Sequence, residues 1–161
     1  MESMKVSLKK GLSYGTTSGV ITSLGLLIGL YSSTNSKGII LAGLLTIAFA
    51  DAFSDGLGIH MSEESEGRFS DRSIWEATIS TVVAKMALGL SFVLPIVFFS
   101  LMTGVIIDIL WGIFVLTSLS YVIARQNKEK VHSVLIEHMS LATFVVIGSF
   151  AIGKLINLFF E

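Results

Sequence analysis

Residues 77–124 read ATISTVVAKMALGLSFVLPIVFFSLMTGVIIDILWGIFVLTSLSYVIA, and the only charged residues in this stretch are Lys85 and Asp108. Because about 20 apolar residues are enough to cross a bilayer as a helix, the stretch is too long for one crossing and is predicted to form a hairpin of two membrane helices. We place its turn near residues 99–103. Pro95 lies just before the turn, and its ring removes one helical hydrogen bond and is expected to kink the end of the first helix.

Similar apolar runs on both sides predict five membrane helices in one domain, residues 1–161. The expected helices are about 12–31, 38–60, 74–99, 101–124 and 132–158. The first run follows three lysines, as a signal peptide would, but it is too long and lacks a small-x-small cleavage pattern, so we expect it to be retained. The predicted fold class is an all-α integral membrane protein.

The composition agrees with lipid as the main solvent. Apolar residues make up 52% of the chain and charged residues 14%, against about 25% charged in soluble domains, and the mean hydropathy is +0.80. A net charge of -1 leaves no basic excess for nucleic acid. The chain has no cysteine, which excludes disulfides and thiolate metal sites. No nucleophile constellation or phosphate-binding glycine loop is present, so neither an enzyme nor a permanently bound cofactor is predicted.

The basic residues predict the orientation, because cytoplasmic loops of membrane proteins are enriched in lysine and arginine. With the N-terminus inside, the inner segments carry eight of the eleven: Lys5, Lys9, Lys10, Arg68, Arg72, Arg125, Lys128 and Lys130. Lys37 and Lys154 are outside, and Lys85 is within the membrane. We expect a cytoplasmic N-terminus, in the plasma membrane if the protein is prokaryotic.

Asp51 and Asp55 are four residues apart, so on a helix they project from nearly the same face, about 6 Å apart along the axis. An ionised residue at a membrane helix centre costs about 2.5–3.5 kcal/mol, so the pair is predicted to face a cation. For Asp51 one interpretation is a structural ion pair with Lys85, which lies at a similar depth. Asp55 is then left over as a cation ligand or proton carrier, and Ser18 and Glu137 at a similar depth are further candidate ligands.

Three more candidate ligands follow at the inner end of the same helix. His60, Glu63 and Glu64 combine imidazole and carboxylate groups, which suit Fe²⁺, Mn²⁺ or Zn²⁺. They are interpreted either as a capture site for incoming cations or as an ordinary solvated helix end. Between the neighbours Glu137 and His138, only Glu137 is kept as a candidate, because adjacent residues point about 100° apart on a helix.

Asp108 is predicted about 10 Å from the outer face. It is either a group that releases an ion or passes a proton, or a hydrogen-bond partner of Thr103 or Trp111. Asp51, Lys85 and Asp108 are the candidates for proton coupling.

Gly11, Gly15 and Gly19 recur at every fourth position of the first helix. Small residues at this spacing let two helix backbones approach closely within a membrane. We predict a homodimer seam along these glycines; the alternative is that they fit the helix against its own neighbours in the chain.

The order of motifs resembles the vacuolar iron transporter family, which includes the nodulin-21-like proteins. The resemblance covers nearly the whole chain, and its segments are GTTSGVITSLGLLIG at 15–29, LAGLL at 41–45, SEESE at 62–66, WEAT at 75–78, Pro95, LIEHM at 135–139 and IGSFAIGK at 147–154. It implies a homodimer with the pathway at the subunit interface, and export of Fe²⁺ or Mn²⁺ from the cytosol against protons.

The sequence departs from the family at three positions. Ser18 stands where the family usually has aspartate, Asp55 where it has methionine, and Ile59 where it has glutamate. The segment between Glu66 and Trp75 has no room for the cytoplasmic metal-binding insertion of many members. Replacing a thioether by a carboxylate favours harder cations such as Mn²⁺, Mg²⁺ or Ca²⁺.

The function predicted from the sequence is transport of a divalent cation out of the cytosol, with proton antiport as the proposed coupling. The alternative is a non-transporting membrane scaffold or assembly subunit, in which Asp51 and Lys85 form a structural pair.

Overall fold

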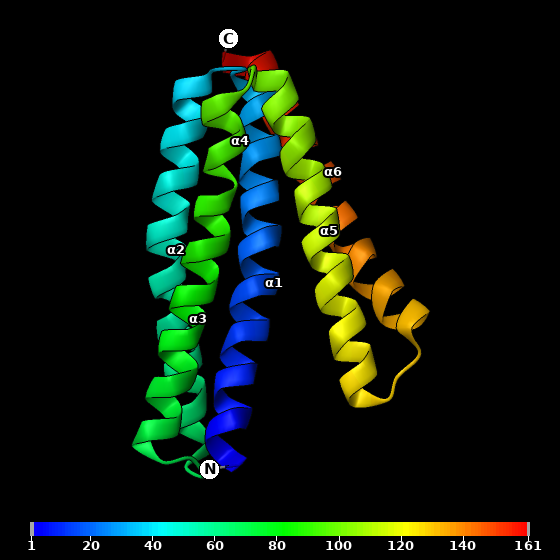
Figure 1. Ribbon diagram of the computed structural model, residues 1–161. Coiled ribbons are helices and arrows are strands. Elements are labelled where there is room, and N and C mark those ends of the chain that lie inside the picture. Colours follow the sequence, from blue (N-terminus) through cyan, green and yellow to red (C-terminus); the bar gives the residue numbers. More distant parts are fainter. Residues whose placement is uncertain (1, 161) are drawn as a thin grey trace.

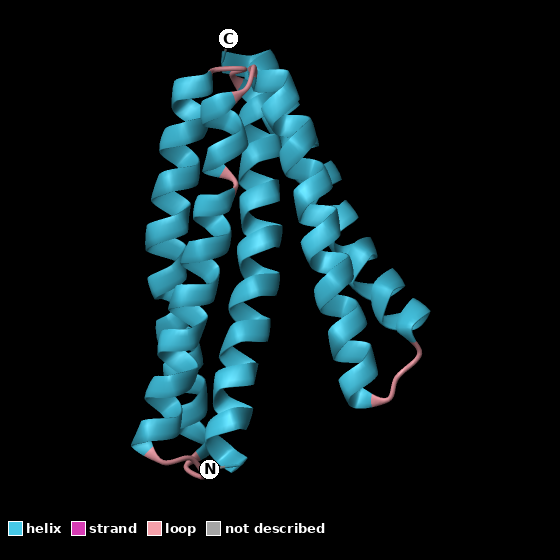
Figure 2. Ribbon diagram, in the orientation of Figure 1, coloured by secondary structure: helices cyan, strands magenta, loops and turns pink. Residues whose placement is uncertain are grey.

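The computed structural model describes residues 2–160, with side chains from residue 6 onward, and this part of the chain is helical without any strand (Figures 1 and 2). The helices are α1 (Glu2–Ser33), α2 (Lys37–Glu66), α3 (Asp71–Ser91), α4 (Val93–Phe98), α5 (Leu101–Asn127) and α6 (Val131–Phe160). Short loops join them, and the two ends of the chain lie at opposite ends of the bundle (Figure 1).

Four segments are long and apolar enough to cross a membrane: α2, α3 with α4, α5 and α6. Their outer faces expose large apolar side chains such as Phe49 and Phe144, which are 63% and 78% exposed. In water such faces would be costly, whereas in lipid they are solvated. The chain therefore has the architecture of a multi-pass helical membrane protein.

The candidate membrane segment formed by α3 and α4 is interrupted at Phe92, between the two helices. Pro95 has no N–H to donate to the carbonyl of Ser91, and the Phe92 N–H turns back to the Gly89 carbonyl at 3.3 Å. The hairpin turn follows at 99–100, inside the range expected from the sequence, and the Ser100 side chain caps α5. Proline therefore explains both the break and its position.

Helix α1 lies at the centre of the bundle and packs against α2, α3, α5 and α6 (Figure 1). Its apolar residues Val20, Leu24 and Leu27 form part of the core. Because protein surrounds it, α1 tolerates hydroxyl side chains: Thr17 and Thr22 donate to carbonyls one turn earlier at 2.9 Å. Four other helices of the described chain thus enclose α1.

The first three glycines of α1, which are Gly11, Gly15 and Gly19, face α3 of the same chain. A Cβ added to Gly15 would lie 2.5 Å from the Thr81 carbonyl oxygen, and one added to Gly19 would lie 3.3 Å from Cα of Lys85. Gly11 meets the carbonyl of Ala77 in the same way. The predicted homodimer seam at Gly11, Gly15 and Gly19 is therefore wrong. The spacing does signal a close helix contact, but the partner is α3 and not a second copy.

Helices α5 and α6 diverge from the other three toward the end of the bundle that carries the N-terminus (Figures 1 and 2). Near the opposite end α5 is held close to α4 by Gly104, where a Cβ would lie 2.9 Å from the Pro95 carbonyl oxygen. Farther along, Gly112 of α5 meets the side chain of Leu24 in α1.

Replacing Gly15 with alanine should lower the free energy of unfolding by about 1–3 kcal/mol, because the new methyl group overpacks against a backbone carbonyl that cannot move aside. Gly58→Ala is the matched control. Nothing lies within 4 Å of a Cβ at Gly58, so that variant should gain up to about 1 kcal/mol from helix propensity. Unfolding in detergent measures both. If Gly15→Ala left the stability unchanged but abolished a dimer, the homodimer seam predicted at these glycines would be correct.

Candidate functional site

The ammonium group of Lys85 lies at the meeting point of α1, α2 and α3. Lys85 is 2% exposed, and its Nζ lies 2.6 Å from Oδ2 of Asp51 and forms a second close ion pair with Oδ2 of Asp55. The same ammonium donates to Oγ of Ser18 at 2.8 Å. Each of the three helices therefore contributes at least one polar group to a single cluster inside the bundle.

Glycine packing places these groups within reach of one another. Gly19, next to Ser18, brings α1 against the α3 backbone at Lys85, and Gly89 brings α3 against α2 at Ala48, where a Cβ would lie 3.1 Å from Cα. The four-residue spacing of Asp51 and Asp55 turns both carboxylates toward the same neighbour. The cluster is thus a consequence of close helix contact and not of long, flexible side chains alone.

The two aspartates are held differently. Ser18 donates its hydroxyl proton to Oδ2 of Asp55 at 2.6 Å while it accepts from Lys85, so Ser18, Asp55 and Lys85 form a closed ring. Oδ2 of Asp51 has an ionic contact with Lys85 but no aligned hydrogen bond. Asp51 is also the more exposed of the two, at 28% against 17% for Asp55.

In their ionised forms the two carboxylates carry one more charge than the single ammonium neutralises. A net negative charge is costly in apolar surroundings, which makes the cluster attractive to a further cation. Asp51 also lines an open hollow of about 700 Å³ on the α1 and α2 side, together with Ser54, Thr46 and apolar residues. The cluster therefore has an approach from the molecular surface.

The other predicted ligands do not join this cluster. Glu137 is exposed on α6, which packs on α1 and α5. Because its side chain points outward, the prediction that it shares a site with Asp55 is wrong.

The residues of the predicted capture site at the end of α2 do not converge on one point. Glu63 is fully buried and ion-paired with Lys10, whereas Glu64 is exposed. His60 Nδ1 lies 3.0 Å from Oγ1 of Thr78. Among residues 2–160, no three histidine or acidic side chains converge in a way that would hold a metal ion. The interpretation as a solvated helix end is also wrong for Glu63.

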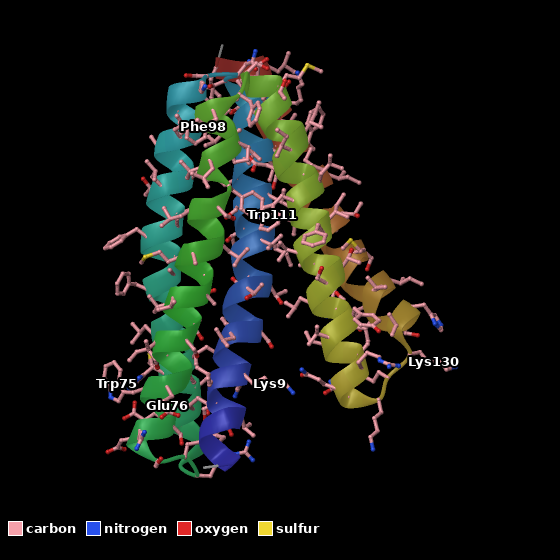
Figure 3. All side chains as sticks on the ribbon, viewed as in Figure 1. Lys9, Trp75, Glu76, Phe98, Trp111 and Lys130 are labelled. Carbon is pink, nitrogen blue, oxygen red and sulfur yellow. The ribbon has the colours of Figure 1, made fainter. Side chains whose placement is uncertain are left out.

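The tautomer of His60 follows from its partner. The Thr78 hydroxyl donates to the Ile74 carbonyl at 2.8 Å, so it accepts from Nδ1–H of His60. Trp75 of α3 packs edge-on against the imidazole ring, with centroids 4.7 Å apart. Trp75 lies on the outward side of α3 (Figure 3). His60 is therefore a fixed contact between α2 and α3.

Asp108 is fully buried, and neither of its carboxylate oxygens has a hydrogen-bond partner among the described residues. Both partners expected from the sequence are engaged elsewhere. Trp111, labelled in Figure 3, donates from Nε1 to Oγ of Ser91 at 2.9 Å, and the Thr103 hydroxyl contacts that of Ser100 at 2.8 Å. The predicted hydrogen bond to Thr103 or Trp111 is absent.

Sequence reasoning missed His138. Its Nδ1 lies 2.8 Å from Oγ of Ser120, which is fully buried on α5 and donates to the Leu116 carbonyl, so Nδ1 carries the proton. The available signal was that five of the six residues at every fourth position of α5 from Gly104 to Ala124 are small or polar, Leu116 being the exception, and this row marks the inner face of the helix. His138 links α5 to α6, whereas its neighbour Glu137 faces out.

No protein-family model matches the chain, and no curated protein has significant similarity to it.

Replacing Lys85 with methionine should lower the free energy of unfolding by about 3–5 kcal/mol, because it leaves two partly buried carboxylates without their cation. Adding Asp51→Asn and Asp55→Asn to Lys85→Met should recover most of the loss, since all three charges are then gone. Thermal unfolding in detergent compares the single and triple variants. A harmless Lys85→Met would show that this ammonium does not neutralise the pair.

Proposed function

We propose that the chain is a transporter of divalent cations, of the Fe²⁺ or Mn²⁺ type, that moves them out of the cytosol. The observation that carries the proposal is the excess negative charge of Asp51 and Asp55 over Lys85, placed beside an open hollow within a membrane bundle. Acidic groups within membrane segments commonly mark ion pathways.

The proposed topology has five spans, with α1 as the fifth. The apolar part of α1 lies among four helices that can each cross a bilayer, and the two chain ends lie at opposite ends of the bundle (Figure 1). The end with the N-terminus also carries the α2–α3 and α5–α6 loops and most of the basic residues, which supports a cytoplasmic position for it.

The cation would take the place that the Lys85 ammonium occupies between the carboxylates. One divalent cation neutralises two carboxylates, and the Ser18 hydroxyl adds a third oxygen ligand next to Asp55. Lys85 would have to move aside or give up its proton when the cation enters. An all-oxygen set favours Mn²⁺ over softer metals.

The resemblance to the vacuolar iron transporter family supports the same function and implies a homodimer. The face available for a second copy is the α1, α2 and α6 side. Two open hollows of about 700 and 630 Å³ lie there and share the apolar residues Leu26, Leu30 and Ile47. A copy placed on this face would cover the approach to Asp51, so the pathway would lie at the subunit interface.

One observation favours the alternative of a scaffold or assembly subunit. Lys85 contacts α1 and α2 through three side chains, which is also what a structural clamp would do. A clamp tolerates replacement of the whole charged set by neutral residues, whereas a cation carrier does not.

Neutralising Asp55 as Asp55→Asn should reduce cation flux roughly 10- to 100-fold or more, because even groups that only support a metal ligand have effects of that size. The measurement is uptake of Mn²⁺, Fe²⁺, Co²⁺, Zn²⁺, Mg²⁺ and Ca²⁺ into proteoliposomes. Asp71→Asn is the matched control, an exposed aspartate at the start of α3, and it should transport normally.

The triple variant Lys85→Met/Asp51→Asn/Asp55→Asn separates the two candidate functions. A folded triple variant without flux, beside an active wild type, supports the transporter. A wild type that moves none of the six cations while the triple variant folds normally supports the scaffold.

A further inference from the structure

Asp108 is the one fully buried carboxylate outside the Lys85 cluster and the Lys10–Glu63 pair within the described chain. The contacts of the residues one turn before and one turn after Asp108 show where its side chain lies in the bundle. One turn earlier, Gly104 touches the Pro95 carbonyl and Ile96 of α4, and one turn later Gly112 touches Leu24 of α1. Asp108 therefore lies where α5 packs on α1 and on the segment that follows the helix break at Phe92.

No charged group faces Asp108 from the helices packed against α5. Helix α4 has no titratable residue, and neither do residues 15–30 of α1 or 139–153 of α6. The titratable residue of α1 on this side is Tyr31, which lines a hollow of about 400 Å³ together with Val105 and Ile109 of α5 but makes no hydrogen bond to Asp108. Lys154 on α6 lines a different, polar hollow of about 390 Å³ with Asn157 and Phe150. On α3, Lys85 is engaged by Asp51 and Asp55. Asp108 has neither an ion pair nor a hydrogen bond among the described residues.

A carboxylate ion without donors or a counter-ion is too costly to bury in an apolar interior, and the group is neutralised instead. A metal ion would need several further oxygen or nitrogen ligands, and no described cluster supplies them here. A proton needs only one carboxyl oxygen and no extra space. We propose that Asp108 is a proton-binding site, held as the neutral carboxylic acid while α5 is closed on α1 and α4.

The helix break gives this site a means of reaching water. Trp111, one turn after Asp108, is hydrogen-bonded to Ser91, the last residue of α3, whose carbonyl has lost the Pro95 N–H as a partner. Asp108 is seven residues from the start of α5, or about 10 Å. Opening the contact at the break would expose the carboxyl to the nearer membrane face, where only its O–H bond forms or breaks and water takes or gives the proton.

The break also connects Asp108 with the cation cluster. Lys85 lies six residues before Ser91 on the same uninterrupted helix α3, so a shift of α3 that accompanies cation binding would reach the contact of Trp111 with Ser91. We therefore assign the bound proton as the ion exchanged for the cation. This second step rests on the proposed function, whereas proton binding itself does not.

Infrared spectroscopy of the protein in lipid vesicles at neutral pH tests proton binding directly. The wild type should show the carbonyl stretch of a protonated carboxyl in apolar surroundings, with slow exchange in heavy water. The band should vanish in Asp108→Asn and remain in Asp71→Asn. If Asp108→Asn does not fold, Asp108→Glu should shift the band without removing it. A wild type without the band, a band that survives in Asp108→Asn, or one that Asp108→Glu leaves unshifted, overturns the proposal.

Flux measurements in proteoliposomes test the exchange. An imposed pH gradient should accelerate cation flux through the wild type, whereas any flux through Asp108→Asn should be the same with and without the gradient. Equal acceleration of both proteins refutes the coupling role. If the wild type moves no cation, the proposed function has failed, and the infrared band still decides whether Asp108 binds a proton.

Discussion

Charge compensation inside lipid is the constraint on which the rest of this structure depends. Asp51 and Asp55 can be kept in a membrane segment only if a cation lies between them, and in this chain that cation is the Lys85 ammonium. The ammonium reaches both carboxylates and Ser18 because α1, α2 and α3 are unusually close, which requires glycine at the crossing points, Gly19 and Gly89. The glycine packing and the charged cluster therefore depend on each other: wider helix spacing would separate the charges.

Acidic side chains within the bundle are accommodated in two different ways on the two sides of the helix break at Phe92. In the α1–α3 half, carboxylates face an ammonium and are partly exposed beside an open hollow. At the α5 contact, Asp108 has no partner and no exposure. In the first arrangement two carboxylates share one ammonium, whereas in the second no charged group faces the carboxyl among the described residues. Helix α3, which carries Lys85 and ends at the break, joins the two.

The sequence was sufficient for features that depend on length and depth. Apolar runs predicted the long helices and the turn after Pro95, and counting residues from the helix ends placed Asp51 and Lys85 at a similar depth, which allowed the ion pair that the structure contains. Predictions from the sequence failed where the outcome depends on the direction in which a side chain points around its helix. Counting matched one lysine to one aspartate, but an ammonium has three donors, so Asp55 was wrongly left without a partner. The same limitation gave Glu137 in place of His138 and a dimer seam in place of the α1–α3 contact, because spacing shows that residues share a face and not which helix that face meets.

Under the proposed relation to the vacuolar iron transporter family, two departures from the family pattern lie at one place in this structure. Relative to the family it resembles, the chain lacks a carboxylate at Ser18 and has an additional one at Asp55. These two positions lie on different helices, yet their side chains are in direct contact, with Oγ of Ser18 2.6 Å from Oδ2 of Asp55. Under the proposed relation, the negative charge is moved across one helix contact and stays within the same cluster. Such an exchange would suit the proposed cation site, since a cation responds to the summed field of its ligands and not to the order of those ligands in the chain.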